Sequence, residues 1–300
     1  MTPLDPFRDG IWLKREDEHQ LGAFKWRGAL ATLEARRPAV SDPGASGPWV
    51  VVTASTGNHG AATAWAARRA GVRAIVFVPE HASATKVALI EAQGAEVRHV
   101  GADMDEAKAA AKELAGREGW FLFEDGAEPA QYDGYAAIGD ELLDQLAEPP
   151  GSVVVPVGNG ALAIGVFRAL AARAPATERV AVSAAGAPAM WESRRGGRPV
   201  DSATCATFAD GLAVRVAIPL AVAELSPLVQ RFELVTEREL ALAVGAYAEV
   251  GIRVEGAAAA PLAVALRESL PRPVVLIVTG RNIDDGLWRR AVETPDSFAA

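Results

Sequence analysis

Short runs of apolar residues, each followed by a small polar or glycine-bearing turn and then by a helical pattern, recur along most of this chain. Residues 49–52 lead into a turn at 53–57, residues 153–157 into one at 158–160, and residues 274–278 into one at 279–282. Apolar runs of this length are typical of strands buried on both faces, and the helical patterns between them are typical of crossover connections. The sequence therefore predicts an α/β fold of parallel sheets with helices on both faces.

Two separate cores are expected, because the predicted strands are too many for one sheet. The alternation is clearest over strands at 50–53, 74–78, 96–100 and 120–123 and helices at 58–70, 83–93 and 103–117. A run rich in proline, glycine and serine, residues 38–48, is a natural crossing between two domains, and residues 124–129 could be the return. We expect residues 192–204, which are polar and carry glycines, to be irregular.

Composition narrows the class of protein. The net charge of -8 argues against nucleic acid, whose binding needs clustered cations. No apolar run approaches the ~20 residues needed to span a bilayer, and no signal peptide is visible at the start of the chain. Cys205 is the only cysteine, which excludes an internal disulfide and fits a reducing, cytoplasmic environment. Four scattered histidines and one cysteine have no metal-ligand spacing, so no metal is expected.

Lys25 is the residue whose chemistry is hardest to replace. Only five of the 30 lysine and arginine residues are lysines, and a guanidinium, unlike an amine, cannot form an imine. Lys25 lies between Phe24 and Trp26 in a glycine-flanked segment at the start of a helical pattern. This setting indicates a Schiff-base lysine that holds an aldehyde cofactor. The alternative is a lysine at a helix start whose stem covers apolar surface.

Two of the turns have the features of anion sites. The first joins a buried strand to a helix, and its glycines let backbone N–H groups approach a ligand at the positive end of the helix; it consists of Gly158, Asn159, Gly160, Ala161 and Leu162. The second offers hydroxyls, an amide and free N–H groups at another helix start; it consists of Ser55, Thr56, Gly57, Asn58 and His59. The alternatives are a plain strand-to-helix turn and an N-cap role for Ser55 or Thr56.

Taken together and in this order, these segments resemble the fold-type II pyridoxal-phosphate (PLP) enzymes, and most closely the threonine/serine dehydratases and serine racemases. Residues 13–17 and 209–214 also look like that group, and the resemblance runs from Thr2 to about Asp284. It implies a two-domain fold like that of the tryptophan synthase β chain. The small α/β domain would be residues 47–127, and the large, discontinuous cofactor-binding domain residues 1–46 plus 128–300. Relatives are usually dimers, so a homodimer is expected.

The resemblance also implies a role for each candidate residue. Lys25 would hold PLP, Phe24 would pack against it, and Asn58 would bond its ring oxygen. Residues 158–162 would bind the phosphate, although Asn159 and Ala161 depart from the glycine run of the dehydratases. The substrate would be bound by Ser55, Thr56, Gly57, Asn58 and His59, of which Ser55, Gly57 and His59 would line the site of its carboxylate. Thr279 would face the pyridine nitrogen, unless it merely ends a strand.

The implied chemistry is elimination. A neutral hydroxyl at Thr279 leaves the pyridine nitrogen largely unprotonated, which makes the ring a weaker electron sink and favours elimination over transamination. We therefore expect an ammonia-lyase that removes water and then ammonia from a serine- or threonine-like amino acid through an aminoacrylate. One alternative is a β-replacement synthase, motivated by Asn159 and Tyr135. A racemase is disfavoured because Thr56 stands where serine racemases carry a serine. A further alternative is a protein that binds PLP or an amino acid without catalysis.

Overall fold

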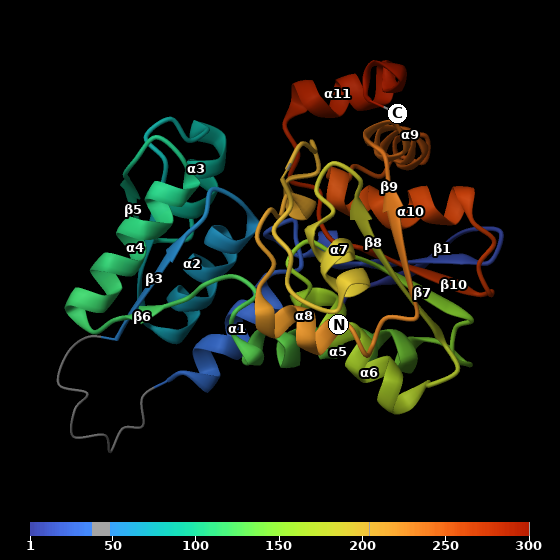
Figure 1. Ribbon diagram of the computed structural model, residues 1–300, viewed down its shortest axis with the longest axis horizontal. Helices are drawn as coiled ribbons and strands as arrows, with labels where there is room; N and C mark the ends of the chain where they lie inside the picture. Colours follow the sequence, from blue (N-terminus) through green and yellow to red (C-terminus); the bar gives the residue numbers. More distant parts are fainter. Residues whose placement is uncertain (38–48, 204, 300) are drawn as a thin grey trace. The chain divides into compact units, whose positions relative to one another are not determined.

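The computed structural model describes residues 1–37, 49–203 and 205–299 and divides into two compact units (Figure 1). The first unit comprises Met1–Phe24 and Tyr135–Ala300, and the second Lys25–Gly134. The predicted crossing at residues 38–48 lies outside the described residues. The predicted small domain, residues 47–127, falls within the range of the second unit, and its limits stay a prediction.

The first unit is built on a six-stranded sheet with the order β1-β2-β10-β7-β8-β9. The strands are β1 (Leu4–Arg8), β2 (Ile11–Arg15), β7 (Ser152–Pro156), β8 (Glu178–Ala184), β9 (Arg231–Val235) and β10 (Val274–Val278). Neighbours are parallel except β1 and β2, which pair antiparallel at one edge. The predicted α/β fold of parallel sheets is confirmed. The edge strand β1 was missed, because Asp5, Pro6 and Arg8 interrupt any apolar run there.

Helices cover both faces of this sheet. They are α5 (Pro129–Gln145), which begins in the second unit, α6 (Ala161–Arg173), α7 (Ala189–Gly196), α8 (Pro219–Leu225), α9 (Glu237–Ala248), α10 (Gly256–Arg267) and α11 (Asp285–Glu293). Val154 and Leu276 belong to the core cluster beneath α9 and α10. Their neighbours Val153 and Val155 point to the opposite face because side chains alternate along a strand, and α6 lies against β7 and β8.

The prediction of irregular structure for residues 192–204 is wrong at its start, because α7 continues to Gly196. Ala189, Met190 and Ser193 give this helix a buried face despite its polar composition. The first unit also contains short 3₁₀ turns, which are η1 (Glu16–Glu18), η2 (Asp210–Leu212) and η3 (Pro295–Ser297).

The second unit has an all-parallel sheet with the order β5-β4-β3-β6. Its strands are β3 (Val50–Ala54), β4 (Arg73–Val78), β5 (Glu96–His99) and β6 (Phe121–Leu122), and its helices α1 (Trp26–Ala35), α2 (Asn58–Ala70), α3 (Ala84–Glu91) and α4 (Met104–Glu118). Along β4, Ile75 and Phe77 pack with α4 on one face. Val76 and Val78 pack with α2 and α3 on the other. This two-sided burial explains the continuous apolar run.

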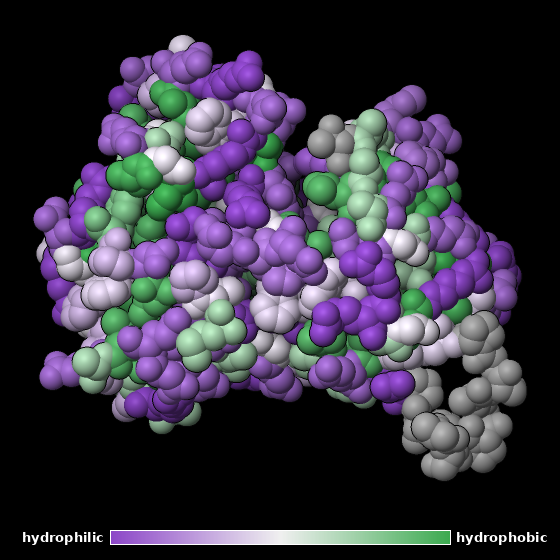
Figure 2. Space-filling model, turned by 180° about the vertical axis from the view of Figure 1, so that it is seen from behind, coloured by the Kyte–Doolittle hydropathy of each residue, from purple (hydrophilic) through white to green (hydrophobic). Residues whose placement is uncertain are grey.

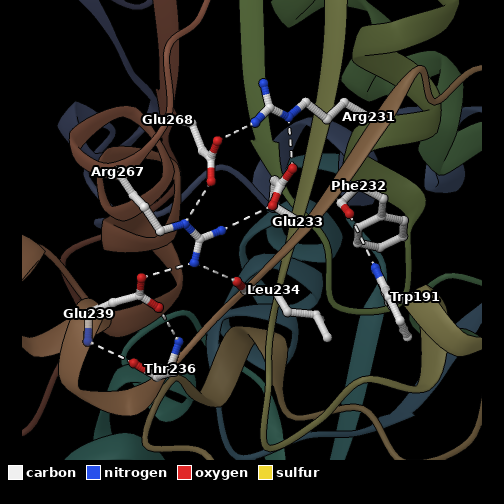
Figure 3. Close-up of polar contacts among 9 residues, drawn as sticks. All are labelled: Trp191, Arg231, Phe232, Glu233, Leu234, Thr236, Glu239, Arg267 and Glu268. Atoms are coloured by element: carbon white, nitrogen blue, oxygen red, sulfur yellow. Dashed lines mark hydrogen bonds and ion pairs between the residues drawn. The ribbon is translucent and has the colours of Figure 1, made fainter. Parts of the chain in front are cut away.

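The free edge of the first unit's sheet is closed by side chains (Figure 3). Within the described residues β9 pairs with β8 alone, so its outer carbonyl groups would otherwise remain open to pairing with another chain. The indole of Trp191 donates to the carbonyl oxygen of Phe232 over 3.2 Å, and Arg267 donates to that of Leu234 over 3.1 Å. These bonds occupy carbonyls two residues apart, which point to the same side of the strand.

Arg267 is the centre of this arrangement. Its guanidinium also contacts Glu233 on β9, Glu239 on α9 and the adjacent Glu268, at 2.9–3.0 Å. Arg231 bridges Glu233 and Glu268 at 2.7 and 2.6 Å. Charge thus ties the end of α10 to β9 and to the first turn of α9.

On the face that Figure 2 shows, hydrophilic residues are interspersed with small hydrophobic areas. Across the described ranges, the helices are too short or too polar to cross a membrane.

Candidate active site

Lys25 directly precedes α1 in the second unit, and a carboxylate holds its amine. The Nζ atom donates a hydrogen bond to Oδ2 of Asp125 over 2.7 Å. Asp125 follows β6, which pairs with β3, so the sheet brings to Lys25 a residue 100 positions away. Both side chains are partly exposed, Lys25 by 16% and Asp125 by 27%. The amine is therefore within reach of a ligand.

Asp125 is held in a fixed position as an anion. The amide of Gln131 donates to its Oδ1 over 3.1 Å, and the same amide accepts from the N–H of Gly126 over 2.7 Å. Burial opposes ionisation of Asp125, but the ammonium of Lys25 and the bond from Gln131 outweigh it and lower the pKa of the carboxyl. Asp125 was missed by the sequence analysis. The sequence feature that could have identified Asp125 is its position after a predicted parallel strand, because functional residues lie at the carboxyl ends of such strands in α/β folds.

His59 points into the core of the second unit. Its Nε2 lies 3.1 Å from Oγ1 of Thr53 and 3.3 Å from the carbonyl oxygen of Phe123, and its Nδ1 lies 3.6 Å from Oδ1 of Asp125. Burial lowers the pKa of His59, so the ring is neutral at pH 7. The structure thus brings His59 to Asp125 and Lys25, and its predicted role at the substrate carboxylate stays a prediction.

The start of α2 has the form of an anion site. Gly57 is its N-cap and has no side chain with which to cap the helix. The hydroxyl of Ser55 accepts from the N–H of Gly57 over 3.1 Å, which shapes the turn. Ser55, Thr56 and Asn58 are half-buried and Gly57 is exposed. The N–H groups of the first turn lie at the positive end of a 13-residue helix, where a carboxylate is attracted.

The turn between β7 and α6 in the first unit has the shape of a phosphate cradle. A Cβ on Gly158 would collide with the carbonyl oxygen of Gly211, and Gly160 has a φ of +96°, so both positions need glycine. Asn159 precedes the N-cap Gly160, and its Oδ1 accepts from the N–H of Ala161 over 3.1 Å. Ala161 and Leu162 are buried in the first turn of α6. This is the strand–glycine turn–helix arrangement that the sequence predicts.

Thr279 carries a hydroxyl that lacks a partner. It follows β10, is only 2% exposed, and within the described part of the chain nothing hydrogen bonds to its Oγ1. A buried hydroxyl without a partner costs about 1–3 kcal/mol, and at the end of a parallel strand this hydroxyl is able to bond a ligand group. Its carbonyl oxygen accepts from the N–H of Phe24 over 3.0 Å, so the residue before Lys25 is tied to the strand end.

The segment that leads to Lys25 is fixed from both sides within the first unit. Asn282 donates from its amide to the carbonyl oxygen of Leu21 over 2.8 Å, and Ala23 forms an antiparallel bridge with Gly280. The ring of Phe24 packs at 5.0 Å from that of Tyr135, which is completely buried. These contacts hold the backbone at Phe24 in one position.

Comparison with known proteins agrees with this chemistry. The model of the pyridoxal-phosphate dependent enzyme family matches residues 2–280. The chain belongs to this family. The residues present fit the cofactor: an amine for its aldehyde, a glycine turn for its phosphate and the unpartnered Thr279 hydroxyl for its ring nitrogen.

Relatives with known names fall in the expected group. An L-threonine ammonia-lyase of Geobacter sulfurreducens is 34% identical over 278 residues, which is 91% of this chain and 67% of that protein. A solved threonine deaminase from Solanum lycopersicum has a TM-score of 0.89 at 27% identity, covering 97% of this chain and 87% of that one. Maize serine racemase has a TM-score of 0.86 at 26% identity, covering 99% and 93%. The chain spans only 38–43% of the length of five further curated relatives.

These findings confirm the predicted resemblance, fold class and cofactor. The roles of individual residues stay predictions. Within the described residues, no group of three or more histidine, cysteine, aspartate or glutamate side chains is placed to hold a metal ion.

Proposed function

We propose that this chain is a PLP-dependent ammonia-lyase that acts on serine, threonine or a closely similar β-hydroxy amino acid. The similarity to L-threonine ammonia-lyase over 91% of the chain supports the reaction class. The observation that carries the proposal is the buried hydroxyl of Thr279, because a neutral group at the ring nitrogen favours expulsion of a β-substituent over transamination.

The residues of the second unit have two tasks in this reaction. PLP, when bound, supplies an aldehyde carbon for an amine to attack and a ring that accepts electrons. Lys25 would hold the cofactor through Nζ, and its free amine would take the proton from the substrate Cα. The start of α2, with Ser55 and Thr56, binds the substrate carboxylate and fixes the direction of the Cα–H bond.

The residues of the first unit hold the cofactor. Backbone N–H groups at the start of α6, shaped by Gly158 and Gly160, bind its phosphate. The hydroxyl of Thr279 would hydrogen bond the ring nitrogen, and because it is neutral it would leave that nitrogen largely unprotonated. The ring of Phe24 packs against Tyr135, and its N–H bonds the carbonyl oxygen of Thr279, so the backbone directly before Lys25 is held in place.

Addition of amino acids one by one to the purified protein tests the proposal. We expect serine or threonine to change the visible cofactor spectrum and to release equal amounts of 2-keto acid and ammonia. Lys25→Ala should lose turnover, and borohydride reduction of the wild-type holoprotein should leave a mass adduct on the peptide that contains Lys25. Full turnover by Lys25→Ala, or an adduct on another peptide, would contradict the assignment of Lys25.

Racemisation is the second candidate, because maize serine racemase aligns over 99% of this chain. Chiral analysis of L-serine after incubation separates the two: a lyase forms pyruvate and leaves no D-serine, whereas a racemase accumulates D-serine. For the β-replacement alternative, Tyr135 is no longer an argument, because its buried ring packs on Phe24. A product that forms only with an added thiol or amine would favour replacement.

We also propose a homodimer located in the cytoplasm. The single cysteine fits a reducing compartment. Light scattering of the eluted holoprotein should give twice the mass of 31.3 kDa, and one chain mass would refute the dimer.

A further inference from the structure

Lys25, Asp125 and His59 form a set in which one anion lies beside two bases. Oδ2 of Asp125 accepts from Lys25 at 2.7 Å, and Oδ1 faces Nδ1 of His59 at 3.6 Å. Across the described ranges, the ionisable groups that act on the His59 ring are Asp125 and Lys25. The family role of the lysine leaves the purpose of the other two residues open.

The hydrogen bonds of the ring fix where its proton lies. The hydroxyl of Thr53 donates to the carbonyl oxygen of Phe123 over 2.7 Å, so its hydrogen is already used. A carbonyl oxygen can only accept. Nε2 of His59, which contacts both oxygens, must therefore be the N–H donor. In the neutral ring the lone pair is then on Nδ1, the atom that faces Asp125.

A lone pair beside a carboxylate is unfavourable unless a cation compensates. In the described state the ammonium of Lys25 neutralises Asp125. A reaction through Lys25 requires its amine to become neutral, and Asp125 is then an anion without its cation. A proton on Nδ1 of His59 would restore the balance, because an imidazolium faces the carboxylate favourably.

We propose that His59 and Asp125 act as a charge-compensating pair for Lys25: each time Lys25 loses its positive charge, Nδ1 of His59 accepts a proton. One proton leaves Nζ and one arrives at Nδ1, so the net charge of the three residues stays zero. When Lys25 accepts the proton from the substrate Cα, Nδ1 releases its proton through the partly exposed carboxylate of Asp125 to solvent. His59 and Asp125 are positioning residues in this scheme, and its catalytic part rests on the proposed function of Lys25.

The coupling has a direct physical signature in the cofactor-free protein. Burial lowers the pKa of His59, the charge of Asp125 raises it and the charge of Lys25 lowers it further. Removal of the Lys25 charge should therefore raise the pKa of His59, and removal of the Asp125 charge should lower it. A nearby charge moves a buried group by about one pH unit or more.

The test is an NMR titration of the histidine ring signals, with the His59 signal identified from a His59→Gln variant. Lys25→Met should raise the midpoint of His59 by at least about one pH unit, whereas Lys25→Arg, which keeps the charge, should return it to the wild-type value. Asp125→Asn should lower it. Glu128→Gln removes a different carboxylate close in sequence, which pairs with Arg36 at 2.8 Å, and should leave it unchanged.

The same midpoint in wild type and folded Lys25→Met, or a rise in Asp125→Asn, would overturn the proposal. A protein that shows the coupling but releases no ammonia from any amino acid would refute the proposed function alone.

Discussion

Thr279→Val should raise the stability of the cofactor-free protein and lower its affinity for PLP. Valine keeps the branched shape of threonine, so the strand end at β10 should be retained. The substitution removes a buried hydroxyl that has no partner among the described residues, whose burial costs about 1–3 kcal/mol. It would also remove the proposed bond to the cofactor ring, worth about 0.5–1.5 kcal/mol, which corresponds to roughly 2- to 13-fold weaker PLP binding.

The chain offers two matched controls. Thr32 is buried in α1, and its hydroxyl likewise has no partner in the described part of the chain. Thr32→Val should therefore stabilise the protein but leave PLP affinity unchanged. The hydroxyl of Thr53 donates to the carbonyl oxygen of Phe123, so Thr53→Val should destabilise the protein by about 1 kcal/mol.

The assay combines urea unfolding of the cofactor-free proteins with a fluorescence titration by PLP. The reasoning fails if Thr279→Val lowers stability as much as Thr53→Val does. It also fails if Thr279→Val binds PLP as tightly as Thr32→Val, because the hydroxyl would then have no role at the ring.

Three further predictions concern the cradle, the sheet edge and acid stability. Gly158→Ala should weaken PLP binding and lower the melting temperature, because its Cβ meets the Gly211 carbonyl, whereas Gly57→Ala, which meets nothing within 4 Å, should retain PLP affinity in equilibrium dialysis. Arg267→Ala should cost about 1 kcal/mol in thermal unfolding, and Arg117→Ala, which loses a pair with Glu118 alone, should cost almost nothing. Folding lowers the pKa of Asp125, so this carboxylate contributes fully to stability above its pKa in the unfolded chain, near ~3.9, and the contribution is lost as pH falls through its pKa in the folded protein. The difference in unfolding free energy between wild type and Asp125→Asn should therefore shrink at low pH. An equal difference at pH 7 and pH 2 would contradict this.

The sequence predicted the strands that are buried on both faces. Val153 and Ile75 lie in such runs, because a parallel strand between two helix layers leaves no polar face to interrupt the pattern. The edge strand β1 was beyond this signal, since it contains Pro6 and pairs on one side only. Local patterns also failed at α7, where three buried side chains support a helix of polar composition.

The candidate site divides in the same way. The glycine turn at Gly158 and the helix start at Asn58 are local features, so their residues could be named from the chain. The pairing of Lys25 with Asp125 depends on the order β3-β6 in the second sheet. The orientation of His59 depends on Thr53 and Phe123, which lie on the neighbouring strand segments. No periodicity records such tertiary contacts.

One rule of topology nevertheless accounts for the positions of Ser55, Asp125, Gly158 and Thr279. In parallel α/β sheets the carboxyl ends of the strands meet at one edge, where turns and helix starts present their N–H groups. In the second unit, Ser55 follows β3 and Asp125 follows β6; in the first, Gly158 follows β7 and Thr279 follows β10. Each unit therefore presents polar groups at the same kind of edge. Lys25 and Phe24 are adjacent in the chain but belong to different units, so the peptide bond between them links the amine to the strand end that carries Thr279.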